Sequence, residues 1–144
     1  MLELNRGRFG TPNVTYVQAD LFDWESEERF DAALVGFFVS HIPPGRWSGF
    51  WDHLASRLEP GGSLFIADDV AGPGRPSSGD VVEDGPSFAH RRKLSDGREY
   101  TIVKRFYEPD ELVATLDTVG WDAEIGASGE FFLYGTARPR SPRR

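Results

Sequence analysis

Hydrophobic residues recur along the first third of the chain in blocks that predict strands. Residues 14–18 read Val-Thr-Tyr-Val-Gln after the breaker pair Pro12-Asn13, and their β-branched and aromatic side chains predict a short strand. Residues 30–39 are almost entirely apolar, which is typical of a strand covered on both faces. Two strands are therefore expected before residue 40.

A helix and another strand are expected next. Apolar side chains recur at helical spacing through residues 46–59 and predict an amphipathic helix. The breakers Pro60-Gly61-Gly62 end this pattern, and residues 63–67 predict another buried strand.

A loop and a hairpin follow the second buried strand. Residues 70–87 contain four Gly, three Pro and three Ser, which interrupt all periodicity and predict a long exposed loop. Loops of this length inside compact domains often act as lids or binding segments, and plain disorder is the alternative. Residues 90–95 and 98–106 flank Asp96-Gly97, a pair typical of two-residue hairpin turns.

The last part of the chain predicts a helix and two strands. Pro109 suits the first position of a helix, and Gly120 suits its end. Residues 121–125 and 131–137 then predict two strands, the second long and aromatic.

This alternation of strands and helices predicts an α/β fold with a mostly parallel sheet that is finished by an antiparallel strand pair. Such sheets bind ligands beyond the carboxyl ends of their strands. Residues 20–22, 36–41 and 68–69 follow predicted strands and are the first candidates for a site.

Composition narrows the classes of protein. The chain has 144 residues, 39% of them hydrophobic, which suits one globular domain. It has no Cys, which excludes a disulfide scaffold, a thiol nucleophile and a thiolate metal site. No apolar run approaches the ~20 residues of a membrane span, and residues 1–10 lack the apolar core of a signal peptide. We therefore expect no membrane partner and a cytoplasmic protein.

The charge is acidic and uneven. The formal net charge is −7, and four Arg within residues 138–144 leave the preceding body at −11. An acidic body repels phosphate backbones, so we expect no nucleic-acid partner. We predict one domain over residues 1–137 and a disordered basic tail over residues 138–144.

Three stretches carry a family resemblance. Residues 14–22, 30–35 and 58–68, in this order and spacing, resemble the second part of a class I S-adenosylmethionine-dependent methyltransferase. The step Leu58-Glu-Pro-Gly-Gly-Ser63 is the most specific of them, and the resemblance covers residues 1–137. It implies a Rossmann-like sheet with strand order 3-2-1-4-5-7-6, S-adenosylmethionine as cofactor and a small-molecule methyl acceptor.

The resemblance implies an adenine site after residues 14–18. In the family an acidic residue after the third strand accepts a hydrogen bond from the adenine amino group, and the next residue offers its backbone N–H. Asp20 and Leu21 hold these positions, and Phe22 can cover a purine face. The alternative is that Asp20 is an ordinary loop or helix-cap residue.

The family's loop after the fourth strand lines the methyl-transfer pocket. Here that loop contains Gly36, Phe37, Phe38 and His41. Methyl transfer needs positioning, an aromatic wall near the sulfonium and sometimes a base. His41 is the candidate base, and a histidine that merely packs in the loop is the equal alternative.

Other titratable residues are expected to have simpler roles. Asp68 and Asp69, with His41 opposite, resemble a hard-metal site, but no third ligand is evident and we predict a strand end without metal. His53 and His90 are expected at the solvated surface.

The family's first strand and its glycine-rich loop have no counterpart in this sequence. No Gly-x-Gly-x-Gly pattern occurs, and residues 1–8 look like the remainder of a helix that follows the family's second strand. The strand over residues 14–18 would then lack its neighbour. Either the sheet closes over the gap, or a second copy completes it as a homodimer, or the native polypeptide begins upstream of Met1. We expect the last of these.

Two functions remain. The first is transfer of a methyl group from S-adenosylmethionine to an O, N or C atom of a small neutral or cationic acceptor by an N-terminally truncated enzyme. The alternative is a non-catalytic methyltransferase-like module that does not bind the cofactor by itself, which the missing glycine-rich loop favours.

Overall fold

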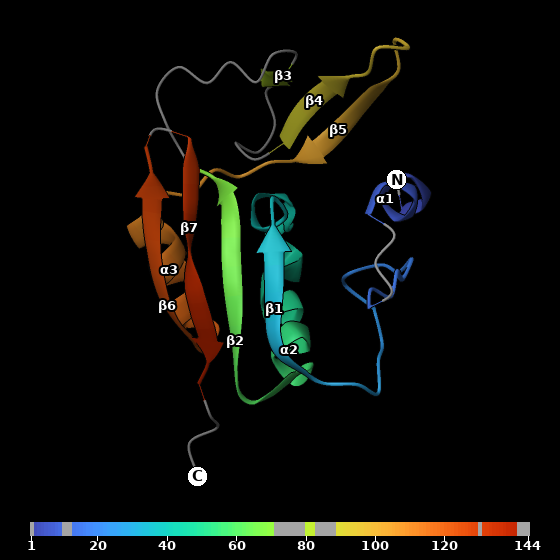
Figure 1. Cartoon of the computed structure of the whole chain (residues 1–144). Coiled ribbons are helices and arrows are strands. Elements are labelled where there is room, and N and C mark those ends of the chain that lie inside the picture. Colours follow the sequence, from blue (N-terminus) through green and yellow to red (C-terminus); the bar gives the residue numbers. More distant parts are fainter. Residues whose placement is uncertain (1, 10–12, 71–79, 83–88, 130, 141–144) are drawn as a thin grey trace.

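The computed structural model describes residues 2–9, 13–70, 80–82, 89–129 and 131–140. Two sheets and three α-helices make up this part of the chain (Figure 1). The larger sheet carries two of the helices, and the smaller one projects from the end at which β1 and β2 finish.

The main sheet has four strands in the order β1 (Phe30–Gly36), β2 (Leu58–Asp69), β7 (Phe132–Pro139) and β6 (Trp121–Ser128). β1 pairs with β2 in parallel, whereas β7 is antiparallel to both β2 and β6. Three strands therefore run in one direction and β7 in the other. This confirms the predicted α/β class, and the order matches the last four positions, 4-5-7-6, of the expected sheet.

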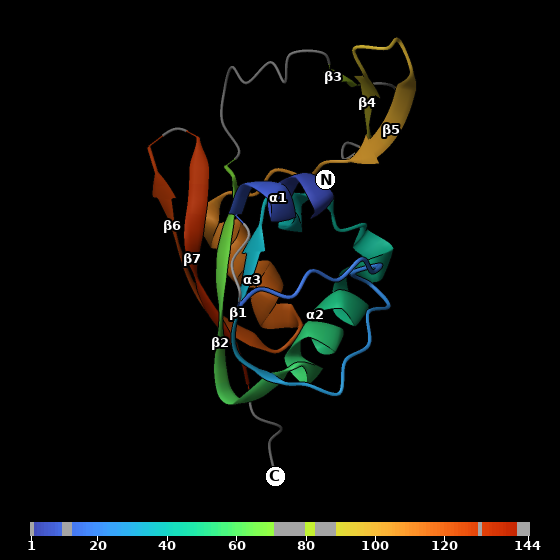
Figure 2. The ribbon, with the colours of Figure 1, turned by 45° about the vertical axis from the view of Figure 1, so that its right-hand side comes forward.

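Helices α2 (Trp47–Ser56) and α3 (Pro109–Thr118) lie on one face of this sheet (Figure 2). α3 begins at Pro109 as predicted, and Asp110 and Glu111 in its first turn interact favourably with the helix dipole. α2 follows a short 3-10 turn, η2 (Pro44–Arg46), so the helical run starts one residue later than expected.

The hydrophobic core lies between these two helices and the sheet. Trp51 is fully buried, and its ring centroid lies 5.2–5.4 Å from those of Trp47, Phe50 and Trp121. Edge-to-face aromatic contacts of this kind add to the free energy gained by burying the rings.

The opposite face of the main sheet is left bare in the described part of the chain. Leu34 on β1 is 70% exposed, and Phe65, Phe132 and Tyr134 on the neighbouring strands are 43–47% exposed. β1 is also the edge strand, because β2 is its only strand partner among the described residues.

The smaller sheet is antiparallel, with β3 (Asp80–Val82), β4 (Ala89–Lys93) and β5 (Glu99–Val103) in that order. β4 and β5 form the predicted hairpin around Asp96-Gly97, where Gly97 takes a positive φ of 88°. β3 corrects one prediction, because it lies within the expected loop over residues 70–87. Of that loop, residues 71–79 and 83–87 lie outside the described residues.

The strand predicted over residues 14–18 is wrong. These residues have no regular secondary structure, and Val14 and Val17 are 49% and 53% exposed. A strand forms only where a neighbour accepts its backbone hydrogen bonds, and no described strand lies beside this segment. The helix expected over residues 1–8 is present as α1 (Leu2–Phe9), where Asn5 accepts a hydrogen bond from the Tyr16 hydroxyl at 3.0 Å.

Two boundaries also differ from the predictions. Pro60-Gly61-Gly62 lie inside β2, because α2 already ends at Ser56 and β2 begins at Leu58. β7 continues to Pro139, and Arg140 pairs with Asp117 at 2.7 Å, so residues 138–140 belong to the fold rather than to a tail. Residues 141–144 lie outside the described residues.

The pairing of β6 and β7 generates a stability prediction. A Cβ added at Gly135 would overlap the backbone carbonyl oxygen of Glu124 and lie 2.8 Å from the Cα of Ile125, both on the neighbouring strand. Gly135→Ala should therefore lower the free energy of unfolding by about 3 kcal/mol or more. Gly126→Ala is the matched control, since its Cβ would meet nothing within 4 Å. Urea denaturation of both variants measures the difference, and equal stabilities would contradict this close approach of the two strands.

Candidate functional site

The carboxyl ends of β1 and β2 meet at a buried hydrogen-bond network around Asp68. The chain leaves β1 into the 3-10 turn η1 (Val39–His41), which places Ser40 beside Asp68 at the end of β2. Asp68 Oδ2 accepts from the Ser40 N–H at 2.9 Å, and Asp68 Oδ1 accepts from the Ser40 hydroxyl at 2.8 Å. Asp68 is 2% exposed and Ser40 1%. A buried carboxylate needs such donors, so this network fixes the turn after β1.

Lys104 brings a positive charge into the same network. Its Nζ lies 2.8 Å from Ser40 Oγ, 2.8 Å from Asp69 Oδ2 and 3.7 Å from Asp68 Oδ1. Lys104 is 5% exposed, so the ammonium is shielded from water and balances the carboxylates beside it. The segment that follows β5 is thereby anchored to the carboxyl ends of β1 and β2.

His41 lies at the edge of this network with a defined hydrogen bond. Its Nδ1 is 2.6 Å from the carbonyl oxygen of Val103, at the end of β5. A carbonyl can only accept, so Nδ1 carries the hydrogen and the ring of neutral His41 keeps its lone pair on Nε2. A half-buried histidine in this tautomer can accept a proton through Nε2.

Asp20 closes a tight turn. Its Oδ1 accepts from the Phe22 N–H at 2.9 Å, and its carbonyl accepts from the Asp23 N–H at 3.1 Å. Phe22 packs against Phe38 with ring centroids 5.8 Å apart, and the Arg46 guanidinium lies 4.4 Å above the Phe22 ring. The turn after residues 14–18 is thus attached to η1 and η2 through stacked side chains.

A groove of about 310 Å³ runs along β1 between this turn and α2. Three predicted cofactor residues, Leu21, Gly36 and Phe38, line it together with other side chains that are mostly apolar. The remaining lining residues are Trp24, Ala33, Leu34, Val35, Phe50, His53, Leu54 and Arg57. Its volume and apolar walls suit the aromatic part of a small ligand.

Phe37 does not join the other predicted cofactor residues. Its φ is +55°, a left-handed conformation that costs a side chain with a Cβ about 1–2 kcal/mol. Its ring is 54% exposed and meets Phe132 of β7 edge to face at 5.9 Å. Phe37 therefore lies on the bare face of the sheet, whereas Phe38 lines the groove on the helix side.

The predicted absence of a metal site remains a prediction. The described residues contain no group of three His, Asp or Glu side chains that could hold a metal ion. The two adjacent carboxylates that suggested such a site, Asp68 and Asp69, both lie within 4 Å of Lys104 Nζ instead.

Two histidines differ from their predicted surface positions. His53 is half-buried on α2 and lines the groove, and its Nε2 has no hydrogen-bond partner among the described residues. His90 is 7% exposed, and its ring lies 6.3 Å from that of Phe106.

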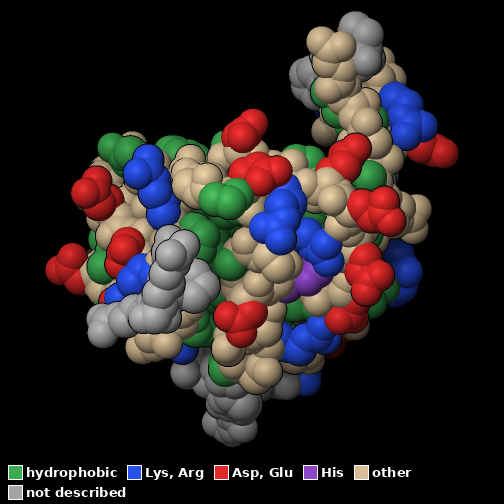
Figure 3. Space-filling model, turned by 90° about the horizontal axis from the view of Figure 1, so that it is seen from below, with side chains coloured by type: hydrophobic (Ala, Val, Ile, Leu, Met, Phe, Trp, Pro, Cys, Tyr) green, Lys and Arg blue, Asp and Glu red, His purple; other side chains and the backbone are tan. Residues whose placement is uncertain are grey.

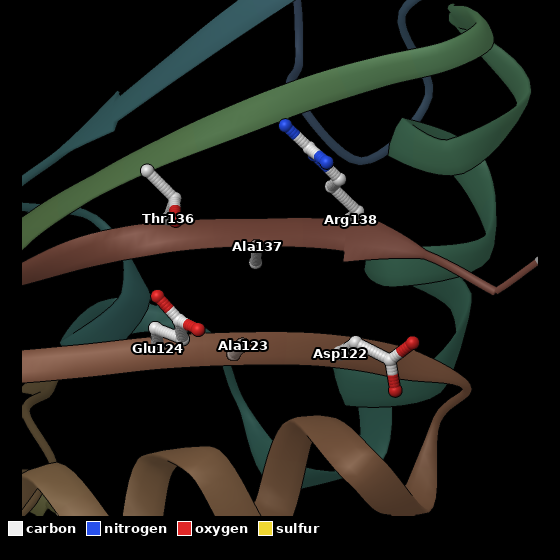
Figure 4. Close-up of a pocket in the computed structure, with 6 residues that line it drawn as sticks. All are labelled: Asp122, Ala123, Glu124, Thr136, Ala137 and Arg138. Carbon is white, nitrogen blue, oxygen red and sulfur yellow. The ribbon is translucent and has the colours of Figure 1, made fainter.

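A second hollow of about 450 Å³ lies on β6 and β7, away from this network (Figure 4). Asp122 and Glu124 from β6 and Thr136 and Arg138 from β7 line it. None of the predicted site residues lies there. Acidic and basic side chains are interspersed over the lower face of the molecule (Figure 3). Within the described residues, no helix has the length and hydrophobicity needed to cross a membrane.

Comparisons with known proteins find solved structures that share this arrangement of strands and helices. No family model and no curated protein sequence matches the chain. The structure of DhpI with SAH superposes with a TM-score of 0.79 and 34% identity, over 98% of this chain and 62% of DhpI. The DhpI–SAM–HEP complex gives 0.80 and 35%, over 95% and 63%. The methyltransferase CcbJ from Streptomyces caelestis gives 0.65 and 17%, over 97% and 71%.

The fold is that of a Rossmann-like α/β protein. More narrowly, the chain has the class I S-adenosylmethionine-dependent methyltransferase fold, which confirms the predicted resemblance. The chain spans slightly less than two thirds of the length of the DhpI structures that it matches.

Sequence reasoning missed the network that organises the site. Neither Ser40 nor Lys104 is among the residues that the sequence predicts for the site. One signal was available, because Asp68 ends a strand predicted to be buried and a buried carboxylate requires a donor or a cation. The spacing along the chain could not show that the partner would come from a hairpin 36 residues later.

Tyr107, which forms a parallel bridge with Val70 beside the network, generates a pH prediction. Burial raises the pKa of its hydroxyl, and the nearby Arg105 guanidinium offsets part of that rise. Because the raised pKa favours the neutral form in the folded protein, Tyr107 contributes stability below its unfolded pKa of about 10 and loses it at higher pH. The Tm of Tyr107→Phe should therefore fall less than that of the wild type between about pH 9 and 11.

The matched control for this prediction is Tyr134→Phe, since Tyr134 is 47% exposed. Tm measured against pH for all three proteins should separate Tyr107→Phe from the other two. Parallel curves for the three would show that burial of the Tyr107 hydroxyl does not couple to folding.

Proposed function

We propose that this protein is an N-terminally truncated form of an S-adenosylmethionine-dependent methyltransferase that acts on a small-molecule acceptor. The observation that carries the proposal is the groove beside β1, where Leu21, Gly36 and Phe38 line one cavity within a methyltransferase fold. The DhpI structures, which are 34–35% identical in sequence to this chain, are complexes with SAH or SAM and support S-adenosylmethionine as the cofactor.

The groove fits one part of this cofactor. Its apolar lining suits an adenine ring, and the neighbouring turn presents the Asp20 carboxylate, whose Oδ1 already accepts from the Phe22 N–H. Asp20 is exposed, so its second oxygen can accept from the adenine amino group. The described residues include no glycine-rich loop for the rest of the molecule. S-adenosylmethionine supplies the methyl group on a positively charged sulfur, which makes it reactive toward O, N or C nucleophiles.

His41 acts in this proposal as the base for the acceptor. Its Nδ1–H donates to the Val103 carbonyl, so the Nε2 lone pair faces away from that bond and takes the proton that the acceptor loses. The β4–β5 hairpin lies beyond the carboxyl ends of β1 and β2 (Figure 1) and is proposed to shape the acceptor pocket. The sequence adds the predicted loop over residues 70–87 to this proposal, although most of that loop lies outside the described residues.

Calorimetric titration of S-adenosylmethionine into the 144-residue chain tests the proposal. A Kd below about 100 μM is expected. Asp20→Asn should weaken binding about tenfold, because it removes a hydrogen bond to a charged acceptor. Asp31→Asn is the matched control, since Asp31 is also exposed but lies at the start of β1. No binding by the wild type would count against the enzyme and for the alternative below.

The alternative is a non-catalytic methyltransferase-like module that does not bind the cofactor by itself, and the lack of a glycine-rich loop in this sequence favours it. In both cases the main sheet has room for a further strand. β1 has a free edge in the described chain, and its Leu34 is 70% exposed beside Phe65 on β2. Exposed edges of this kind pair with further strands. Two sources fit, namely an upstream part of a longer native protein and a second copy that forms a homodimer.

A cytoplasmic location also remains a prediction from composition.

The homodimer has its own test. Leu34→Lys places a charge on the free edge, where it opposes strand pairing between copies. If a second copy completes the sheet, sedimentation analysis should show a dimer for the wild type and a monomer for Leu34→Lys. Leu4→Lys is the control, because Leu4 is 65% exposed on the helix α1 and is not part of a strand edge. A wild type that is monomeric would exclude the second copy.

A further inference from the structure

Three contacts tie the segment after β5 to the turn that carries His41. The Val103 carbonyl accepts from His41 Nδ1 at 2.6 Å, and the Arg105 N–H donates to the Ser40 carbonyl at 2.7 Å. Between them, Lys104 Nζ donates to Ser40 Oγ at 2.8 Å. The carbonyl that accepts from His41 belongs to the peptide unit that joins Val103 and Lys104. The hydrogen bond of His41 and that of the Lys104 side chain therefore depend on the same short stretch of backbone.

We propose that Lys104 is a positioning residue for His41. By holding the Val103 carbonyl against the imidazole, it keeps the hydrogen of His41 on Nδ1 and the lone pair on Nε2. The inference deepens the proposed function and rests on it for the role of His41 as a base. Lys104 itself reaches neither the groove lining nor the His41 ring in the contacts of the structure.

The chemistry of the network explains why a lysine is needed there. Ser40 Oγ has one hydrogen, which it donates to Asp68, so its remaining hydrogen bond requires a donor. Asp69 also needs compensation, and the Lys104 ammonium serves both at 2.8 Å. The aromatic ring of Phe106 lies 5.1 Å from Nζ and adds a cation–π contact. An apolar side chain of similar length, such as that of Met, satisfies none of these groups.

Burial makes the position of Lys104 well defined. At 5% exposure the side chain has little freedom, and both of its closest oxygens belong to the ends of the main sheet rather than to the hairpin. The small sheet is therefore joined to η1 by the Lys104 ammonium, by the backbone hydrogen bond from the Arg105 N–H to the Ser40 carbonyl, and by the hydrogen bond from His41 Nδ1 to the Val103 carbonyl. Loss of the ammonium leaves the backbone contacts to hold the Val103 carbonyl alone.

A purely structural role for Lys104 makes a different prediction. In that case a substitution of Lys104 lowers the free energy of unfolding, but the folded molecules keep the same tautomer of His41. The tautomer of His41 therefore distinguishes the two roles, because it reports the hydrogen bond to Val103 rather than the free energy of unfolding.

The test is long-range ¹H–¹⁵N NMR of the three imidazole rings in the uniformly labelled 144-residue chain, at a pH where they are neutral. The signals of His41 are identified by their loss in His41→Gln. We expect the Nδ1–H tautomer in the wild type and loss of that signature in Lys104→Met. Lys93→Met is the matched control in the same hairpin, since Lys93 is exposed and lies 4.0 Å from Glu99, and it should match the wild type.

Folded Lys104→Met that retains the Nδ1–H signature would overturn the proposal. If this variant does not fold, Lys104→Met combined with Asp69→Asn removes the buried ammonium together with the half-buried carboxylate that it pairs with, and the same two outcomes apply. Titration with S-adenosylmethionine is run on the same samples, and Lys104→Met should bind with unchanged affinity because Lys104 does not line the groove. Failure of the wild type to bind would contradict the proposed function, whereas the NMR result decides the role of Lys104 by itself.

Discussion

The buried carboxylate of Asp68 is the constraint on which the site depends. It ends β2 at 2% exposure, where an unsatisfied charge would cost several kcal/mol, so nearby groups must donate to it. Ser40 donates twice and thereby sets the path of the chain after β1. Lys104 completes the charge balance and brings the end of β5 to the same place. One desolvated carboxylate thus determines how two sheets and one turn meet.

The two proposed parts of the site follow from that meeting. The groove uses the apolar side chains on the helix side of β1, where Phe38 and Phe50 pack with their ring centroids 5.6 Å apart. The proposed base uses the polar side, where His41 is held by a backbone carbonyl. Small-molecule sites usually combine mostly apolar walls, which bind the ligand, with a few precisely placed polar groups. The groove and the proposed base match this combination.

Local pattern was enough to predict most of the fold, and long-range contacts account for the errors. The hairpin at Asp96-Gly97 and the helix that starts at Pro109 depend on neighbouring residues, and both were predicted. Residues 14–18 have the composition of a strand, but strand formation depends on a partner that the described chain does not provide. The groove residues Leu21 and Phe38 came from the family resemblance. The tie from Lys104 to Ser40 joins positions that no local pattern relates.

The left-handed backbone at Phe37 breaks the alternation of side chains between the two faces of the sheet. Along β1, Leu34 faces the bare side of the sheet and Val35 packs against the core, so continued alternation would send Phe37 toward the helices. The positive φ inserts a half-step, and Phe37 meets Phe132 on the bare side while Phe38 meets Phe22 on the other. The rings of Phe37 and Phe38 are consecutive in the chain but lie on opposite faces of the sheet. A spectroscopic label on one of them therefore detects binding on its own face and not on the other.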